Sequence, residues 1–102
     1  MSNLKGILAA MCTPMDNHGK SIDMGIYRAH IDEMISAGLH GVVLGSGTGE
    51  YAYLTQNEKR ELISEGVRHV GKKIPTVAQV TELSTQEVID GALFAQDEGV
   101  DA

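Results

Sequence analysis

Apolar residues along the chain fall into short, nearly unbroken runs and into longer stretches with helical spacing. The short runs cover residues 6–12, 41–44 and 74–80, and polar, glycine or proline residues follow each of them. Continuous apolar runs of this length are typical of strands that are buried on both faces, as in a parallel sheet. We therefore predict strands in these three ranges.

Three longer stretches, at about 23–37, 55–71 and 84–99, carry apolar residues at three- and four-residue steps. The second begins with Thr-x-x-Glu and the third with Ser-x-x-Glu, which is the pattern of a capping box. A glycine ends or follows each stretch, as is common at helix C-termini. The predicted order is β-α-β-α-β-α, which implies parallel strands joined by right-handed crossovers.

The last residues repeat the step that leads from the first helix into the second strand. Residues 37–41 read Ala-Gly-Leu-His-Gly, and residues 98–102 read Glu-Gly-Val-Asp-Ala. By this analogy a fourth strand would follow. We expect residues 1–102 to be the N-terminal segment of one larger domain, truncated before that strand, because an open three-stranded sheet leaves edges and helix faces uncovered.

Composition excludes several classes of protein. The 102 residues are 42% hydrophobic and carry a formal net charge of −6 without a Lys/Arg cluster, which argues against nucleic acid as a partner. No apolar run approaches the ~18 residues of a membrane span. The only cysteine is Cys12, and the start MSNLKG has no hydrophobic signal region, so we expect a cytoplasmic protein. With 4% aromatic residues, large core side chains are few.

The segment Gly-Ser-Gly-Thr-Gly-Glu at 45–50 is the strongest candidate for chemistry. It follows the second predicted strand, and ligands of parallel α/β folds bind beyond the carboxyl ends of strands. Its glycines allow close approach of backbone N–H groups to a carboxylate or phosphate. A dinucleotide fingerprint would need glycine where Glu50 stands, and no lysine completes a Walker loop. The alternative is a glycine-rich turn without a ligand.

Three stretches resemble the dihydrodipicolinate synthase/N-acetylneuraminate lyase family. They are Ala-Met-Cys-Thr-Pro-Met-Asp-Asn-His-Gly at 10–19 with Ile22, the 45–50 segment followed by Leu54-Thr55 and Glu58-Lys59-Arg60, and Ile-Pro-Thr-Val-Ala at 74–78. The resemblance covers the whole chain. It implies a (β/α)8 TIM barrel of ~250 residues, of which this chain supplies the first three βα units.

The resemblance also implies a class I, Schiff-base lyase or aldolase that acts on pyruvate or a related 2-keto acid. No separate cofactor is expected, because the family forms a covalent imine between pyruvate and a lysine. That lysine and the catalytic tyrosine would lie beyond Ala102, so we expect no catalytic residue in this chain and no activity from it alone. A homo-oligomer, dimer or tetramer, is likewise implied.

Carried over by position, Gly47 and Thr48 would bind the substrate carboxylate, and Ser46 and Tyr51 are candidate pocket-lining residues. Gly47 departs from the family, in which many members have Thr or Ser. A glycine N–H still binds a carboxylate but cannot relay a proton, which argues against the lysine-biosynthesis reaction and leaves the wider aldolase reading intact. Gln79 also departs, since the family often has glycine there.

Other candidates have structural interpretations. Lys20 lies in a loop on the correct side but is predicted to be exposed, so it is a poor substitute for the Schiff-base lysine. Cys12 is expected to be a small core residue. Glu50 could be a general acid, but we expect a structural role in which it accepts hydrogen bonds from groups of the turn or of a neighbouring strand. The charged residues of 58–68, Lys59 included, are expected to form a solvated helix face. Tyr53 is assigned to packing at the start of a helix or to a subunit contact.

The histidines His18, His30, His40 and His69 lack metal-ligand spacing, so no metal site is predicted. A second hypothesis remains open beside the enzyme. In it the chain is non-catalytic and self-associates through its uncovered strand edges.

Overall fold

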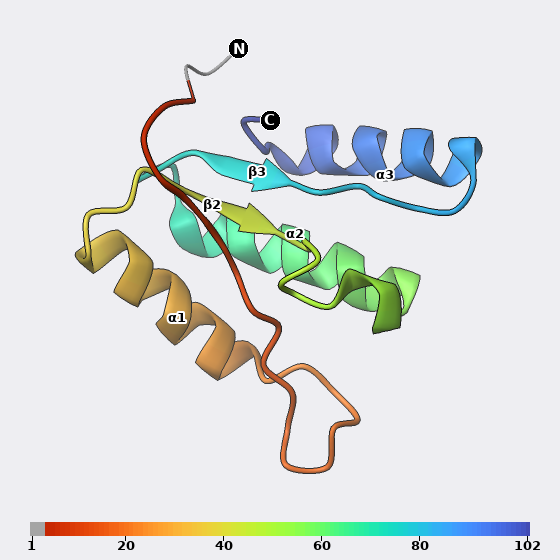
Figure 1. The fold of residues 1–102 in the computed structure, drawn as a ribbon, viewed down its shortest axis with the longest axis horizontal. Coiled ribbons are helices and arrows are strands. Elements are labelled where there is room, and N and C mark those ends of the chain that lie inside the picture. Colours follow the sequence, from red (N-terminus) through yellow and green to blue (C-terminus); the bar gives the residue numbers. More distant parts are fainter. Residues whose placement is uncertain (1–3) are drawn as a thin grey trace.

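Strands and helices alternate along the chain in the computed structural model, which describes residues 4–102 (Figure 1). Residues 1–3, the first part of the start MSNLKG discussed above, lie outside the described residues. The elements are β1 (Leu8–Ala10), α1 (Met24–Ser36), β2 (Gly41–Leu44), the 3-10 helix η1 (Tyr51–Tyr53), α2 (Gln56–Val70), β3 (Thr76–Ala78) and α3 (Thr85–Glu98). All six predicted strands and helices are present, so the α/β prediction is confirmed.

The three strands form one parallel sheet in the order β1-β2-β3. Ala9 lies opposite Val42 on one side, and Val42 lies opposite Thr76 on the other. The flanking strands are shorter than predicted because β2, which both must pair with, is itself only four residues long. Pairing continues slightly past β1, where the Met11 N–H donates to the Val43 carbonyl at 3.0 Å.

Polar side chains begin the three helices, and glycines end two of them, where the sequence predicts. Asp23, Thr55 and Ser84 each accept a hydrogen bond from a backbone N–H in the first turn of α1, α2 and α3, respectively. At α2 the full capping box is present. Gly71 and Gly99 close α2 and α3 in the left-handed conformation, with φ of 58° and 97°. These residues satisfy backbone groups that helix ends leave unpaired.

The helices pack on one face of the sheet, because right-handed crossovers between successive neighbouring strands all place their helix on the same side. Val42 and Leu44 point into this layer and are fully buried. The largest buried side chains are Tyr27, Ile31, Leu44, Leu62, Val42 and Val70. The opposite face is open, since Ala10 is exposed and Val43 half-buried. The prediction that the strands are buried on both faces is therefore wrong for residues 4–102.

One aromatic residue anchors the core between α1 and α2. The Tyr27 side chain is 1% exposed, and its hydroxyl donates a 2.9 Å hydrogen bond to the Leu62 carbonyl. Burial raises the pKa of this hydroxyl, and the nearby Glu65 carboxylate raises it further. Gly66 makes room for the contact, because a Cβ there would lie 2.6 Å from Leu44 and 2.8 Å from the Tyr27 hydroxyl.

The residues after α3 return to the free edge of β3. The Asp101 N–H donates to the Thr76 carbonyl, and the Ala78 N–H donates to the Ala102 carbonyl, both at 2.9 Å. The predicted fourth strand and the domain boundary remain predictions. Within residues 4–102, the helices are too short or too polar for any of them to span a bilayer.

Candidate functional site

The segment 45–50 folds into a tight turn at the carboxyl edge of the sheet, directly after β2. Gly45 enters the turn in the left-handed conformation, with φ of 70°. The Glu50 N–H donates to the Gly47 carbonyl at 2.9 Å, and the Tyr51 N–H donates to the Ser46 carbonyl at 3.3 Å. These two bonds close the turn and present its tip, residues 47 and 48, to solvent. We call residues 46–51 the glycine turn.

The tip of the glycine turn carries backbone donors without acceptors. Within residues 4–102, no acceptor is found for the N–H groups of Gly47, Thr48 and Gly49. Gly47 and Thr48 are exposed, and Thr48 adds a hydroxyl beside its own N–H. Successive unpaired N–H groups together with a hydroxyl form a concave surface suited to an anion. The carboxylate-binding role of Gly47 and Thr48 stays a prediction at this point.

The glycine turn is held in place by the first strand. The Thr13 side chain is buried, and its hydroxyl donates a 2.6 Å hydrogen bond to the Gly49 carbonyl. The backbones approach so closely that a Cβ on Gly49 would lie 2.9 Å from the Met11 carbonyl oxygen. In the sequence Thr13 follows the first predicted strand, within the stretch 10–19 that carries the family resemblance, and no individual role was predicted for it. Its position at the carboxyl end of a neighbouring parallel strand was the available signal.

Ser46 points away from the exposed tip. It is 6% exposed, and its hydroxyl finds no partner within residues 4–102. The residue contributes to the turn through its carbonyl, which accepts the Tyr51 N–H. The structure therefore places the candidate Ser46 in the base of the turn, with its hydroxyl turned inward.

The Tyr51 side chain lines a cavity beside the tip of the glycine turn. This cavity of about 180 Å³ lies between the loop after β2 and the loop after β3, and is lined by Tyr51, Ala52, Lys59, Thr81, Glu82 and Leu83. Lys59 Nζ lies 2.9 Å from Glu82 Oε1 and 5.7 Å from the centroid of the Tyr51 ring. The Lys59 and Glu82 side chains are only 19% and 12% exposed. The prediction of a solvated position for Lys59 is wrong, because its side chain is paired with Glu82 from one loop and lies over the Tyr51 ring from the other.

Glu50 helps to form the glycine turn through its backbone rather than its side chain. It adopts a left-handed conformation with φ of 59°, which is uncommon for a residue other than glycine. Its side chain is exposed, and within residues 4–102 no group donates to its carboxylate. The expectation that this carboxylate accepts hydrogen bonds in the turn is therefore wrong for the described chain.

Cys12 is exposed rather than buried in the core, which corrects the sequence-based expectation. It follows β1 and contributes to a cavity of about 220 Å³ together with His30 and Glu33 of α1. Among residues 4–102 no group of three His, Cys, Asp or Glu residues is placed to hold a metal ion.

The loop between β1 and α1 projects from the lower end of the molecule (Figure 1). It carries Lys20, whose side chain is exposed and whose N–H donates to the Asp16 carboxylate at 3.0 Å. This N–H, together with the Ser21 hydroxyl, lowers the pKa of Asp16 below its ordinary value. Asp16 organises the loop, and Lys20 stays at its surface, as predicted.

Two of the four histidines, His40 and His69, have structural partners. His40 Nδ1 accepts the Ile7 N–H at 2.9 Å, where the chain enters β1. His69 Nε2 lies 2.8 Å from an Asp32 carboxylate oxygen and so connects α2 to α1.

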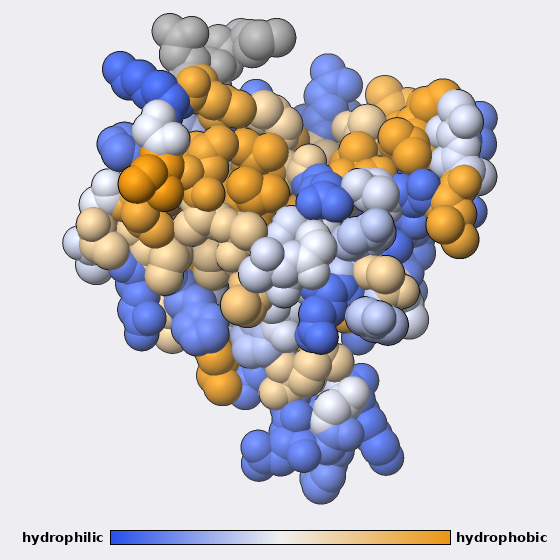
Figure 2. Space-filling view, viewed as in Figure 1, coloured by the Kyte–Doolittle hydropathy of each residue, from blue (hydrophilic) through white to orange (hydrophobic). Residues whose placement is uncertain are grey.

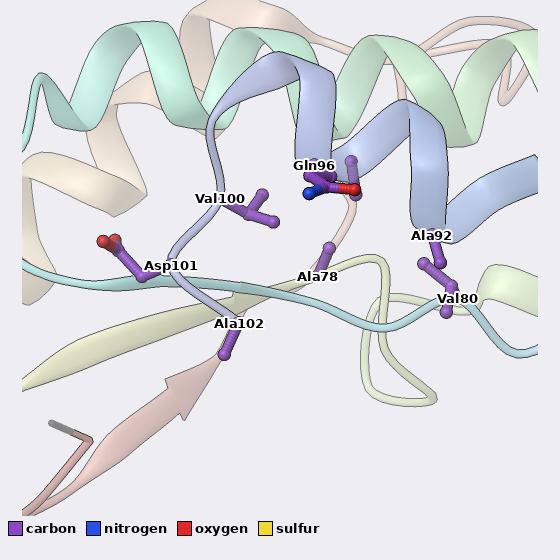
Figure 3. A pocket seen from close by; sticks show the side chains of 8 residues that line it. Ala78, Val80, Ala92, Gln96, Val100, Asp101 and Ala102 are labelled. Atoms are coloured by element: carbon purple, nitrogen blue, oxygen red, sulfur yellow. The ribbon is translucent and has the colours of Figure 1, made fainter. Parts of the chain in front are cut away.

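A larger cavity, of about 400 Å³, lies between β3 and α3 at the far edge of the sheet. Ala92 and Gln96 from α3 face Ala78 and Val80 from the β3 side across it (Figure 3). Apolar side chains also gather on the surface above α3 (Figure 2), where Ile89 and Leu93 are exposed. This apolar region lies apart from the glycine turn and carries none of the predicted site residues.

Comparison with known proteins gives the same fold along the whole described chain. The 4-hydroxy-tetrahydrodipicolinate synthase of Ralstonia nicotianae is 36% identical over 102 residues, which are 100% of this chain and 34% of that protein. The crystal structure of a putative dihydrodipicolinate synthetase from Pseudomonas aeruginosa superposes with a TM-score of 0.95 at 29% identity, over 98% of this chain and 34% of that one.

A third relative was crystallised with a ligand. The structure of the chloride-inhibited dihydrodipicolinate synthase from Acinetobacter baumannii, complexed with pyruvate, superposes with a TM-score of 0.93 at 30% identity, over 97% of this chain and 34% of that one. The chain thus spans about a third of the length of these relatives. The superpositions agree with the predicted fold class, the N-terminal part of an α/β barrel.

The family comparison extends over nearly all residues. The dihydrodipicolinate synthetase family matches residues 3–102, including the glycine turn, Thr13 and the third strand. This chain belongs to the dihydrodipicolinate synthetase family.

Proposed function

We propose that residues 1–102 form the carboxylate-binding part of a Schiff-base lyase that acts on pyruvate or a related 2-keto acid. The observation that carries the proposal is that, within residues 4–102, the N–H groups of Gly47, Thr48 and Gly49 have no acceptor and lie next to the Thr48 hydroxyl. Family membership and the pyruvate complex of the Acinetobacter baumannii relative support pyruvate as the ligand.

Each group has a chemical role in this proposal. The backbone N–H groups donate to the carboxylate oxygens, and the Thr48 hydroxyl donates a further hydrogen bond. Hydrogen bonds to a charged acceptor contribute about 1.5–3 kcal/mol each, which is enough to orient a small keto acid. Gly47 has no hydroxyl to relay a proton, which argues against the lysine-biosynthesis reaction, so the proposal is the wider class of lyase or aldolase steps on a 2-keto acid.

The covalent step is proposed to depend on a lysine and a tyrosine outside residues 1–102. Among the lysines of the chain, Lys59 is paired with Glu82, and Lys72 donates to the Gly99 carbonyl near the amino ends of the strands. Lys20 is exposed on the projecting loop. Borohydride reduction with pyruvate should therefore leave no adduct on a lysine of this chain.

A titration tests the binding proposal on the chain itself. Pyruvate should shift the amide NMR signals of Gly47, Thr48 and Gly49, and the neutral analogue pyruvamide should leave them unchanged. Thr48→Val should weaken pyruvate binding about tenfold, since one charge-assisted hydrogen bond is lost. Equal shifts with pyruvate and pyruvamide, or shifts confined to other residues, would contradict the proposal.

Self-association is a second candidate, and the apolar cavity between β3 and α3 favours it. The cavity has a volume of about 400 Å³, and Ile89 and Leu93 lie exposed on α3 at 46% and 55%. A homo-oligomer could cover this surface. Size-exclusion chromatography with light scattering distinguishes the cases, because a well-folded monomer would contradict self-association. A cytoplasmic location is part of the first proposal.

A further inference from the structure

We propose that Lys59 is a positioning residue that holds the glycine turn in its ligand-binding shape, an inference that rests on the proposed function of that turn. Lys59 lies in the first part of α2, outside the turn, and touches neither Gly47 nor Thr48 by any hydrogen bond found in residues 4–102. It acts through Tyr51, the last residue of the turn.

The contact with Tyr51 connects the lysine to the backbone of the turn. Lys59 Nζ lies 5.7 Å from the centroid of the Tyr51 ring, within the range of a cation–π interaction. The Tyr51 N–H closes the turn by donating to the Ser46 carbonyl. Because Lys59 Nζ lies over the Tyr51 ring, it restrains the residue whose N–H closes the turn, and with it the tip between Ser46 and Tyr51.

Glu82 holds the Lys59 side chain in position. It comes from the loop after β3, and its Oε1 lies 2.9 Å from Lys59 Nζ. With 19% and 12% of the two side chains exposed, this pair is shielded from the solvent that weakens ion pairs on open surfaces. The adjoining cavity of about 180 Å³ leaves the Tyr51 ring room to move if the lysine is removed.

The glycine turn is thus restrained from both neighbouring strands. Thr13 holds Gly49 from the β1 side, and the Lys59–Glu82 pair holds Tyr51 from the β3 side. The exposed residues Gly47 and Thr48 lie directly before Gly49, inside the turn that the Tyr51–Ser46 hydrogen bond closes. Removal of either restraint should loosen the tip without unfolding the core, which is built from α1, α2 and β2.

Amide hydrogen exchange tests this directly in the full chain. The Glu50 and Tyr51 amides report closure of the turn, and the Val42 amide, bonded to the Pro75 carbonyl, reports the sheet. In Lys59→Met the first two should exchange about tenfold faster, while the Val42 amide is unchanged. Lys59→Arg should restore most of the protection. Lys73→Met, at an exposed lysine before β3, is the matched control and should change neither.

Two results would overturn the proposal: unchanged exchange of Glu50 and Tyr51 in Lys59→Met, or a proportional increase at Val42, which would indicate a general loss of stability. Glu82→Gln preserves side-chain shape and provides the same comparison if Lys59→Met fails to fold. It should raise exchange at the turn by a smaller factor, and no effect there would count against the pair.

Pyruvate affinity then separates this inference from the proposed function. In Lys59→Met the dissociation constant for pyruvate should rise three- to tenfold, with the same amides shifted at saturation. A loosened turn with unchanged affinity would overturn the positioning role. If pyruvate fails to bind the unmodified chain, the proposed function fails, whereas the exchange result still decides whether Lys59 restrains the turn.

Discussion

The Thr13 hydroxyl donates a 2.6 Å hydrogen bond to the Gly49 carbonyl and so joins the end of the first strand to the turn that follows the second. Both residues are buried. The bond connects positions 36 residues apart, at the edge of the sheet where ligands of parallel α/β folds bind. It makes the shape of the glycine turn dependent on a residue that does not belong to it.

Replacement of Thr13 by Val should destabilise the protein by about 1–3 kcal/mol, because the buried Gly49 carbonyl loses its donor while side-chain volume is kept. Urea unfolding measures the change. Thr13→Ser keeps the hydroxyl and should retain most of the stability. An equal loss in both variants would show that the methyl group matters and the hydrogen bond does not.

Gly49→Ala should lower the stability of the fold, whereas Gly47→Ala should leave it nearly unchanged. A Cβ at Gly49 would lie 2.9 Å from the Met11 carbonyl oxygen and 3.0 Å from Thr13 Oγ1, so the turn must shift, at a cost of about 1–3 kcal/mol. A Cβ at Gly47 meets no atom within 4 Å, and its φ is not in the left-handed region. Thermal unfolding of the two variants checks this, and similar melting temperatures would contradict the close approach at Gly49.

Gly66 and Gly25 provide a second matched pair, both within helices. Gly66→Ala should destabilise the fold by about 1–3 kcal/mol, since its Cβ would lie 2.6 Å from Leu44 in a filled core. Gly25→Ala, at an exposed position of α1, should stabilise by about 0.5–1 kcal/mol through higher helix propensity. Denaturant midpoints at constant m-value measure both. A destabilised Gly25→Ala would contradict the described exposure.

Stability below neutral pH should depend on Glu65. Hydrogen bonds from Arg68 and then Arg28 hold the pKa of this carboxyl below its ordinary value of 4.5. Because the pKa is lowered in the folded state, the carboxylate stabilises the fold at every pH above its ordinary pKa. This contribution is lost as the pH falls through the pKa of the folded state.

The stability difference between the unmodified protein and Glu65→Gln should therefore be constant from pH 7 to about 5 and shrink at lower pH. Chemical unfolding at stepwise pH values measures it. Glu61→Gln is the control, because Glu61 is exposed and forms no ion pair within residues 4–102. A difference that grows on acidification would reverse the sign and contradict the assigned interactions.

The elements and their caps could be predicted because they depend on neighbours in sequence. The capping box of Thr55 and Glu58 spans one helical turn, and Gly71 and Gly99 end helices through their own backbone freedom. The glycine turn could be located for the same reason, from its glycines and its place after a strand. The family resemblance rests on these local patterns, and the match over residues 3–102 confirms it.

Burial and side-chain partners were decided by the tertiary structure. Cys12 was expected in the core and is exposed, because the described chain covers only one face of the sheet. Lys59 was expected in solvent and is paired with Glu82, 23 residues away. Periodicity along a helix indicates which face is apolar, but it carries no information on which loop folds over the helix end.

The amino-acid sequence thus predicted the order of strands and helices, the ends of the helices and the position of the glycine turn, since each follows from interactions within a few residues. The packing of β1, β2 and α2 established how that turn is held. Thr13 and Lys59 reach it only when three parallel strands bring their carboxyl ends to one edge. Contacts between residues distant in sequence depend on that geometry, and so only the folded chain reveals them.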